Sequence, residues 1–346
     1  MSSLSYWIRR QALNTWGYMQ SAEDVADQIA KVYQKASGYL SAEANQVFAK
    51  FQGKHHLTEK EARQLLNTLR DRASIDELRQ ALRNAGGPGA ASLLAELESP
   101  AYQARIERLQ QMQNSLDLVM RQVFGQEKRL GTAFYTDLAN EAYYKSIFEI
   151  QQRAGYGFGF ARVDPKVINR ILNSKWSGAN YSDRIWTNTQ ALAVSLKEEL
   201  LINLITGRTN REVAQIIQNK FGSGAMEARR LVRTEACFVA GEMEAISYEE
   251  CGIEEYRYVA VLDLKTSKPC QELDGKTFKV KDRQPGKNYP PMHPWCRSTT
   301  MADIGAEALA KTKRRARDPV TGKSILVPAD MTYRDWYKKY VYVEEG

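Results

Sequence analysis

Three side chains in the last third of the sequence have the chemistry of metal ligands or of nucleophiles. They are spaced as C-x22-H-x2-C and are Cys270, His293 and Cys296. Zinc prefers thiolate and imidazole ligands, and a short His-x-x-Cys turn can supply two of them. Pro294 fixes its own φ angle and favours an extended His293, so the segment PPMHPWCRSTTM is predicted to form a stiff turn.

This set of residues supports more than one kind of site. A fourth ligand, for which Cys251, Asp263 and Asp274 are candidates, would complete a structural zinc site. Three ligands with an open position would instead make the catalytic zinc of a metal-dependent hydrolase or nuclease. Without a metal, the cysteines would be small buried side chains and the histidine would hydrogen-bond a backbone carbonyl. A nucleophilic pair is disfavoured because no orienting third residue can be named, and a disulfide is disfavoured in a reducing cytosol.

A second group of polar residues, Arg233, Thr234 and Glu235, lies in the middle of a long predicted helix. Nearby positions on a helix point in different directions, so Arg233 and Glu235 are not expected to pair with each other. We predict that one of them faces the strands that follow and anchors them through a buried or half-buried polar contact.

The densest positive charge lies in the segment KTKRRAR, which contains no acidic residue. Its five basic residues are Lys311, Lys313, Arg314, Arg315 and Arg317. With a net charge of +8 over 346 residues, the chain permits contact with nucleic acid without requiring it. The segment therefore predicts either a nonspecific site for double-stranded DNA or a solvated surface helix or linker.

The elements that must position these residues are mostly helical. Capping boxes predict helix starts at Thr58, Ser74 and Thr209. A narrow apolar stripe of the coiled-coil type follows over about three heptads, and a helix of an intramolecular bundle explains it better than self-association does. Its members are Tyr102, Ile106, Leu109, Met112, Leu116, Val119 and Val123.

Later segments change from helix to strand. The helix that begins at Thr209 is predicted to stop at Gly222, and a second, longer helix is predicted to end at Gly252. The apolar period then becomes two, which predicts a strand, at Tyr256, Tyr258, Ala260 and Leu262. A turn at Asp274–Gly275 and a second short strand would complete a small sheet against the long helix. The glycine–aromatic segment GYGFGFARVDP is expected to be a buried junction between domains.

These patterns predict a mainly α protein of the α+β class. We expect a helical region over 1–150, built as a bundle or a coiled-coil-like arm, and a mixed loop and helical region over 151–252. A small α+β region with a short sheet and a basic tail would occupy 253–346. With 43% hydrophobic and 26% charged residues, the composition is that of a globular protein, and we expect neither a signal peptide nor a membrane span.

Three motifs, in the same order, resemble the C-terminal signature of the phage head-morphogenesis family, the Mu F-like minor capsid proteins. They are ARRLVRTEA, YRYVAVLDLKTSKPCQELDGKTF and PPMHPWCRSTTM, and the likeness extends from Tyr144 to Met301. Where many relatives have a second cysteine in T-C-x-x-C, this chain has Ser267, which favours a hydrogen-bonded turn over a tight zinc site. The residues that match the family pattern are Arg233, Thr234, Glu235, Asp263, Thr266, Asp274, Gly275, Pro294 and Arg297.

The resemblance implies a minor capsid protein, of the type found in phages and prophages of Gram-positive bacteria. Such a protein would have a structural and assembly role at the portal vertex, in head morphogenesis, DNA packaging or DNA ejection. Its expected partners are the portal protein, scaffold or major capsid protein and double-stranded DNA, inside the procapsid or virion after assembly in the host cytoplasm. Some relatives carry a toxin or ADP-ribosyltransferase domain after the signature. About 45 residues follow Met301, too few for such a domain, so no enzymatic activity is expected.

Overall fold

The structure is a computed structural model that describes residues 4–48, 57–154, 157, 159–303, 313–328 and 331–341. It is 70% helical and carries two small antiparallel sheets in its last third, which confirms the predicted mainly α, α+β class. The helices are α1 (Leu4–Phe48), α2 (Glu59–Leu66), α3 (Ile75–Ala85), α4 (Pro88–Glu98), α5 (Pro100–Ala154), α6 (Pro165–Leu172), α7 (Tyr181–Thr206), α8 (Asn210–Glu250), α9 (Lys268–Leu273) and α10 (Tyr333–Tyr340). The strands are β1 (Glu255–Val259), β2 (Thr277–Lys279), β3 (Thr299–Asp303), β4 (Lys313–Arg317) and β5 (Ser324–Pro328).

The described residues form two compact units. The first lies within residues 1–25, 130–181 and 230–346, and the second within residues 26–129 and 182–229. Helices α1, α5 and α8 each contribute residues to both units, so each unit is assembled from segments far apart in the sequence.

In the second unit, the apolar stripe of α5 forms part of the core. The predicted positions are buried except for Val119, which is half-buried, and Met120 is buried in its place. A step of four after Leu116 keeps the stripe on the inner face, because successive steps must average about 3.6 residues. Since these side chains are buried within one chain, the stripe belongs to an intramolecular bundle.

The predicted stop at Gly222 is wrong, because α8 runs unbroken from Asn210 to Glu250. Gly224, two residues further on, serves packing rather than termination. A Cβ atom at Gly224 would lie 2.8 Å from a ring carbon of Tyr33 and 2.9 Å from a methyl carbon of Leu192. Glycine at this position therefore lets α8 approach those two side chains closely.

Three predicted capping residues begin helices as expected. The hydroxyl of Thr58 accepts the backbone N–H of Glu61 at 3.3 Å, and the carboxylate of Glu61 accepts the backbone N–H of Thr58 at 2.8 Å. Thr209 and Glu212 repeat this arrangement before α8, with the same two distances. Ser74 caps α3 by accepting the backbone N–H of residue 77.

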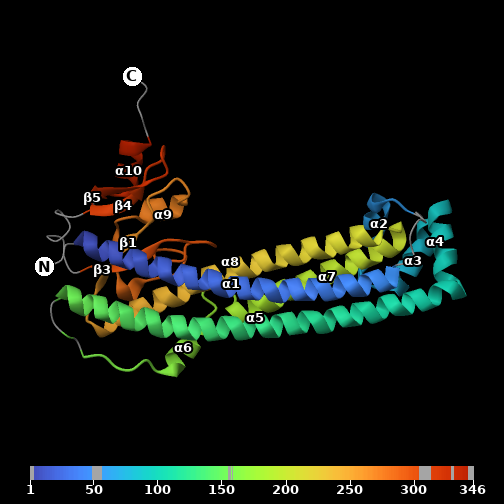
Figure 1. The fold of residues 1–346 in the computed structure, drawn as a ribbon, viewed down its shortest axis with the longest axis horizontal. Helices are drawn as coiled ribbons and strands as arrows, with labels where there is room; N and C mark the ends of the chain where they lie inside the picture. Colours follow the sequence, from blue (N-terminus) through green and yellow to red (C-terminus); the bar gives the residue numbers. More distant parts are fainter. Residues whose placement is uncertain are drawn as a thin grey trace, which may run out of the picture. The chain divides into compact units, whose positions relative to one another are not determined.

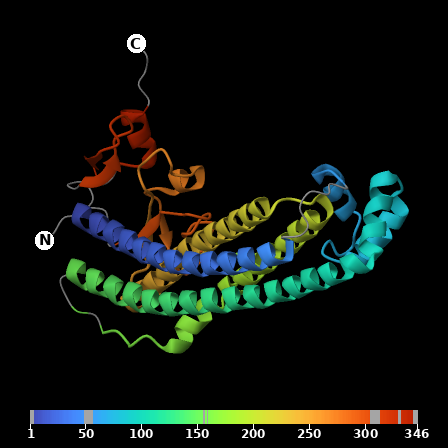
Figure 2. The same ribbon diagram turned by 45° about the vertical axis from the view of Figure 1, so that its right-hand side comes forward.

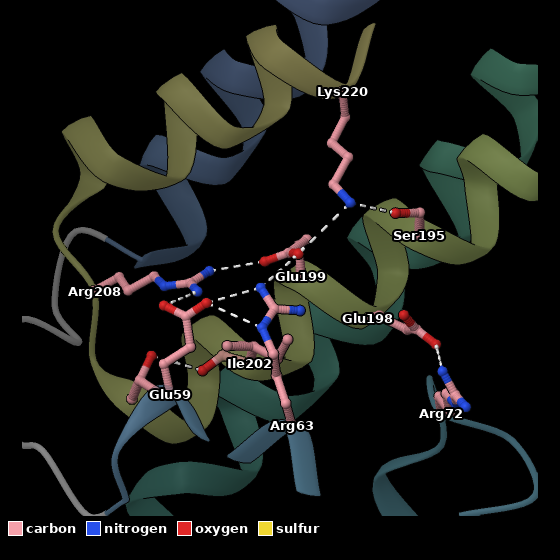
Figure 3. Close-up of polar contacts among 10 residues, drawn as sticks. Glu59, Arg63, Arg72, Ser195, Glu198, Glu199, Ile202, Arg208 and Lys220 are labelled. Atoms are coloured by element: carbon pink, nitrogen blue, oxygen red, sulfur yellow. Dashed lines mark hydrogen bonds and ion pairs between the residues drawn. The ribbon is translucent and has the colours of Figure 1, made fainter. Parts of the chain in front are cut away.

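A network of charged side chains joins α2, α7 and the start of α8 in the second unit (Figure 3). Glu199 of α7 is buried and accepts hydrogen bonds from Arg63 at 3.0 Å and from Arg208 at 2.9 Å. The same two arginines also reach Glu59, at 2.9 and 2.8 Å, and Lys220 lies 3.7 Å from Glu199. Although burial opposes ionisation, Arg208 and Arg63 hold the pKa of Glu199 below its usual value.

In the first unit, a three-stranded antiparallel sheet of order β2–β1–β3 packs against the C-terminal half of α8. Tyr289, shortly before β3, donates its hydroxyl hydrogen to the carbonyl of Gly241 in α8 at 2.7 Å. The helix ends as predicted near Gly252, which has a φ of 67°. Tyr256 and Tyr258 are buried in β1 as the period of two predicts, but the strand ends at Val259, which is also buried, and Ala260 and Leu262 are buried beyond it.

The start of α1 and the end of α5 complete this unit, and both lie beside the strands in the two views of the ribbon (Figures 1 and 2). Trp7 and Ile8 of α1 share an apolar cluster with Val259 and Met301 of the sheet. Arg153, near the end of α5, donates to the carbonyl of Ala302 at 2.6 Å. The sheet is therefore covered by helices from three separate parts of the sequence.

A second sheet pairs β4 with β5 beside α10, in the red part of the ribbon (Figure 2). Leu262, Ala316, Val327, Tyr333 and Trp336 form its buried cluster. The basic segment is thus a strand from Lys313 onward, and not the helix or linker considered above. Burial of Ala316 explains this, because pairing with β5 brings that side chain into the apolar cluster. Lys311 lies outside the described residues.

The glycine–aromatic segment is not the buried junction that we expected. Phe160 is 48% exposed, and Gly157 and Gly159 are exposed as well. Gly155, Tyr156 and Phe158 lie outside the described residues. No described helix is long and apolar enough to cross a membrane.

Candidate functional site

The segment His293–Cys296 forms a tight turn in the first unit. The backbone N–H of Cys296 donates to the carbonyl of His293 at 3.1 Å, which makes Pro294 and Trp295 the two central residues. Trp295 has a φ of 63°, the left-handed value that the third position of a type II turn requires. A residue other than glycine there costs about 1 kcal/mol, so contacts elsewhere must hold the turn.

Helix α8 supplies those contacts. The guanidinium of Arg233 lies over the Trp295 ring, 5.5 Å from its centre, and Arg233 also forms an ion pair with Glu23 of α1. The backbone N–H of Trp295 donates to the hydroxyl of Thr234 at 3.4 Å. Arg233 therefore contacts the turn before β3 and not a strand, and Thr234, which the prediction did not name, makes the hydrogen bond to the turn.

Glu235 faces a different part of the unit. Its carboxylate accepts the indole N–H of Trp176 at 3.2 Å, and the Trp176 ring stacks on Phe238 with 4.9 Å between centres. Glu235 is buried. Arg233 and Glu235 thus have separate partners, as their directions on the helix predict.

Cys270 reaches the same turn from α9. The helix begins after Ser267, with Pro269 in its first turn, and Cys270 follows as a buried residue. Before it, the hydroxyl of Thr266 donates to the backbone carbonyl of Val261. The hydroxyl of Tyr258, in β1, donates to the sulfur of Cys270 at 3.3 Å, which fixes the thiol against the sheet.

The three predicted ligands converge. The Cys270 sulfur lies 3.5 Å from His293 Nε2 and 3.9 Å from the Cys296 sulfur, and all three ligand atoms are within 4.8 Å of one another. Both cysteines are buried and His293 is half-buried. His293 Nδ1 lies 2.7 Å from the carbonyl oxygen of Pro294. Because a carbonyl only accepts, Nδ1 carries the hydrogen, and the lone pair of Nε2 points to Cys270.

The two thiols are poor nucleophiles in this environment. A hydrogen bond with Cys296, together with burial, raises the pKa of Cys270 to about 12. A hydrogen bond with Cys237, together with burial, raises the pKa of Cys296 to about 11. Since the thiolate is the reactive form, these values argue against a Cys270–His293 nucleophilic pair.

The two carboxylates considered as a fourth ligand have other roles. Asp263 binds Arg297 through two hydrogen bonds, of 2.6 and 2.8 Å, and although burial opposes it, Arg297 holds the pKa of Asp263 below its usual value. Asp274 accepts the backbone N–H groups of Ala260 and Tyr333, each at 2.8 Å. Both carboxylates therefore brace the chain around the turn.

The remaining candidate residues lie close by or apart from the cluster. Gly275 has a φ of 79°, and its N–H donates to the carbonyl of Tyr258, so it forms the predicted turn before β2. Cys251, just after α8, is not one of the three converging ligands. The basic residues that begin at Lys313 belong to β4 and are not part of this cluster.

One side of the cluster opens into a cleft of about 380 Å³. Cys270 and His293 line it together with Ser267, Lys265 and Trp295. Sequence patterns placed Tyr258 in a strand but gave it no role at this site, and they did not single out Trp295 or Glu23. The histidine turn drew attention to its neighbourhood, but nothing local indicates that Glu23, more than 200 positions away, would pair with Arg233.

Comparison with known proteins gives two matches. Residues 195–301 match the family described as phage Mu protein F like protein. Over 190 residues the chain is 23% identical to NAD(+)–arginine ADP-ribosyltransferase EFV of Enterococcus faecalis. The aligned region covers 54% of this chain and 39% of that protein. The chain thus spans well under two thirds of that relative. No solved structure matches significantly.

Proposed function

We propose that the protein is a minor capsid protein of the phage head, because residues 195–301 match the family described as phage Mu protein F like protein. The family supports a role in head morphogenesis. Within that role we place the protein at the portal vertex, where it would help assembly, DNA packaging or DNA ejection. The portal protein is its proposed main partner, and scaffold or major capsid protein are further ones.

The residues that match the family pattern form hydrogen bonds within the protein, which supports a structural role rather than a catalytic one. Asp263 is bound to Arg297, Asp274 binds two backbone N–H groups, and Thr234 accepts from Trp295. These hydrogen bonds join α8, the segment after β1 and the turn before β3 into one module. These hydrogen bonds fix the shape of the module, and a protein that acts in assembly needs a fixed shape for its partners to bind.

Contact with DNA is a compatible part of this proposal. The basic residues on β4 and the net charge of +8 suit a protein that lies close to packaged DNA. Such contact would be nonspecific, because phosphate contacts carry no sequence information.

The name of the Enterococcus relative suggests a second candidate, transfer of ADP-ribose to arginine. At 23% identity over 39% of that protein, this activity does not carry over to the present chain. An assay with labelled NAD and an arginine-rich acceptor tests it directly. We expect no transfer above a heat-treated control, and transfer that depends on the folded chain would overturn the non-enzymatic proposal.

The portal contact is tested by copurification. The tagged portal protein of the same phage or prophage is coexpressed with this chain and captured under native conditions. We expect the chain to be retained with the portal protein and not with an unrelated protein that carries the same tag. Loss of the chain at the first wash, while the portal protein assembles normally, would contradict a portal-bound role.

A further inference from the structure

We propose that Cys270, His293 and Cys296 bind one zinc ion, with the fourth coordination position open to the adjacent cleft. The ion would fasten α9 to the turn before β3. This inference is independent of the role in the phage head, because it concerns only the chemistry of three converging side chains.

Two of the separations between the ligand atoms are those of a zinc tetrahedron, and the third pair, Cys296 and His293, lies within 4.8 Å. Bond lengths of about 2.3 Å to sulfur and about 2.0 Å to nitrogen place two tetrahedral sulfurs about 3.8 Å apart, and a sulfur and a nitrogen about 3.5 Å apart. The corresponding separations here are 3.9 Å between Cys270 and Cys296, and 3.5 Å between Cys270 and His293 Nε2. A single ion can therefore reach these atoms without a change of backbone.

The surroundings hold the ligands in the orientation that a metal needs. Metal-binding histidines usually donate their second ring N–H to a carbonyl or carboxylate, and His293 Nδ1 has this contact with the carbonyl of Pro294 at 2.7 Å. The hydroxyl of Tyr258 donates to the Cys270 sulfur, a contact that also stabilises a thiolate.

The open side determines the coordination of the site. The cleft of about 380 Å³ is lined by Cys270 and His293, so a water molecule can occupy the fourth position. Ser267 lines the same cleft and is a weaker ligand than a cysteine would be. Asp263 and Asp274 are bound elsewhere, as described above. We therefore infer three protein ligands and one exchangeable ligand, with zinc preferred over magnesium or calcium because the ligands are soft.

Cobalt(II) substitution of the purified, reduced full-length chain tests this site. We expect about one equivalent of cobalt to produce the intense visible bands of a tetrahedral ion, a thiolate-to-metal charge-transfer band, and loss of both on addition of zinc. Zinc is also expected to raise the melting temperature of the wild-type chain, and a chelator to reverse this, with no effect from magnesium. Octahedral spectra, or no spectral change together with no thermal shift, would overturn the proposal.

Variants locate the site. Loss of a hydrogen-bond partner of a metal ligand typically weakens metal binding by roughly 10–100-fold. Cys270→Ser and His293→Ala remove a ligand itself, so they are expected to weaken zinc binding by more than this. His293→Cys keeps a zinc ligand at this position and should retain tight binding. If it does, the weaker binding of His293→Ala is due to loss of the ligand and not to unfolding caused by loss of the histidine. Cys251→Ser should bind like the wild type, because Cys251 is not one of the converging ligands. Unchanged binding in Cys270→Ser, or abolished binding in Cys251→Ser, would contradict the three ligands named here.

Discussion

Asp263 binds both terminal nitrogens of the Arg297 guanidinium and thereby joins the segment after β1 to the loop that leads into β3. The two-point geometry matches the planar fork of arginine to a carboxylate. The carboxylate is mostly buried, with 14% of its side chain exposed, whereas 35% of the arginine side chain is exposed. This pair fixes the two ends of the module that carries Cys270 and His293.

Replacement of Arg297 should show the value of the two-point ion pair. Arg297→Ala is expected to lower the free energy of unfolding by about 1–2 kcal/mol, because Asp263 remains partly buried without its partner. Arg297→Lys keeps the charge but forms one hydrogen bond fewer, so its destabilisation should be about half as large. Urea denaturation of the three proteins measures this, and equal stability of Arg297→Ala and wild type would show that the pair contributes nothing.

The network around Glu199 predicts a pH-dependent stability. Its pKa is lowered in the folded state, so its contribution is present above the unfolded value of 4.5 and is lost as the pH falls through the folded value. Glu199→Gln should therefore cost about 2 kcal/mol at neutral pH and progressively less below about pH 4.

Glu198, the preceding residue on α7, is the matched control for this prediction. It pairs with Arg72 at 3.2 Å at a more exposed place (Figure 3). Glu198→Gln should cost less than about 0.5 kcal/mol at any pH. Chemical denaturation over a pH series measures both variants, and a cost for Glu199→Gln that is constant with pH would contradict the ionic origin of its contribution.

Two glycines of α8 should respond in opposite ways to the same substitution. Gly224→Ala is expected to destabilise the protein by about 1–2 kcal/mol, because the new methyl group would overlap Tyr33 and Leu192. Gly222→Ala meets no atom within 4 Å and should stabilise the helix by about 0.5–1 kcal/mol. Thermal unfolding compares the two, and stabilisation by both would mean that α8 does not need the close approach at Gly224.

The basic segment predicts how DNA affinity depends on salt. Replacement of Lys311, Lys313, Arg314, Arg315 and Arg317 by glutamine should weaken binding to double-stranded DNA. The slope of log K against log salt should fall by about 0.9 for each phosphate that the segment no longer neutralises. Binding of random and defined duplexes should be equally affected. An unchanged slope, measured by fluorescence anisotropy over a salt series, would show that this segment does not bind DNA.

Local sequence patterns predicted several helix starts and a strand, but they did not predict how the helices pack against one another. The capping residues and the alternation of Tyr256 and Tyr258 depend on neighbours in the sequence, and the structure agrees with both, although the strand ends at Val259. The continuity of α8 across Gly222 and Gly224 could not be predicted, because it depends on Tyr33 and Leu192 from other helices.

The candidate site shows the same division. The spacing of His293 and Cys296, with a proline between them, was enough to predict a turn that presents both side chains. The left-handed Trp295 was not predictable, since its conformation is supported by Arg233 and Thr234 from α8. Which carboxylates remained free for a metal likewise depended on long-range partners, such as the backbone N–H of Tyr333 that Asp274 accepts.

The role in the phage head is tested most directly by quantitative mass spectrometry of gradient-purified procapsids, assembled with and without the portal protein. We expect this chain in procapsids that contain portal protein, at a constant and low ratio to it, and its absence from procapsids assembled without portal protein. Absence from portal-containing procapsids of a phage that expresses the gene would contradict a minor capsid protein at the portal vertex.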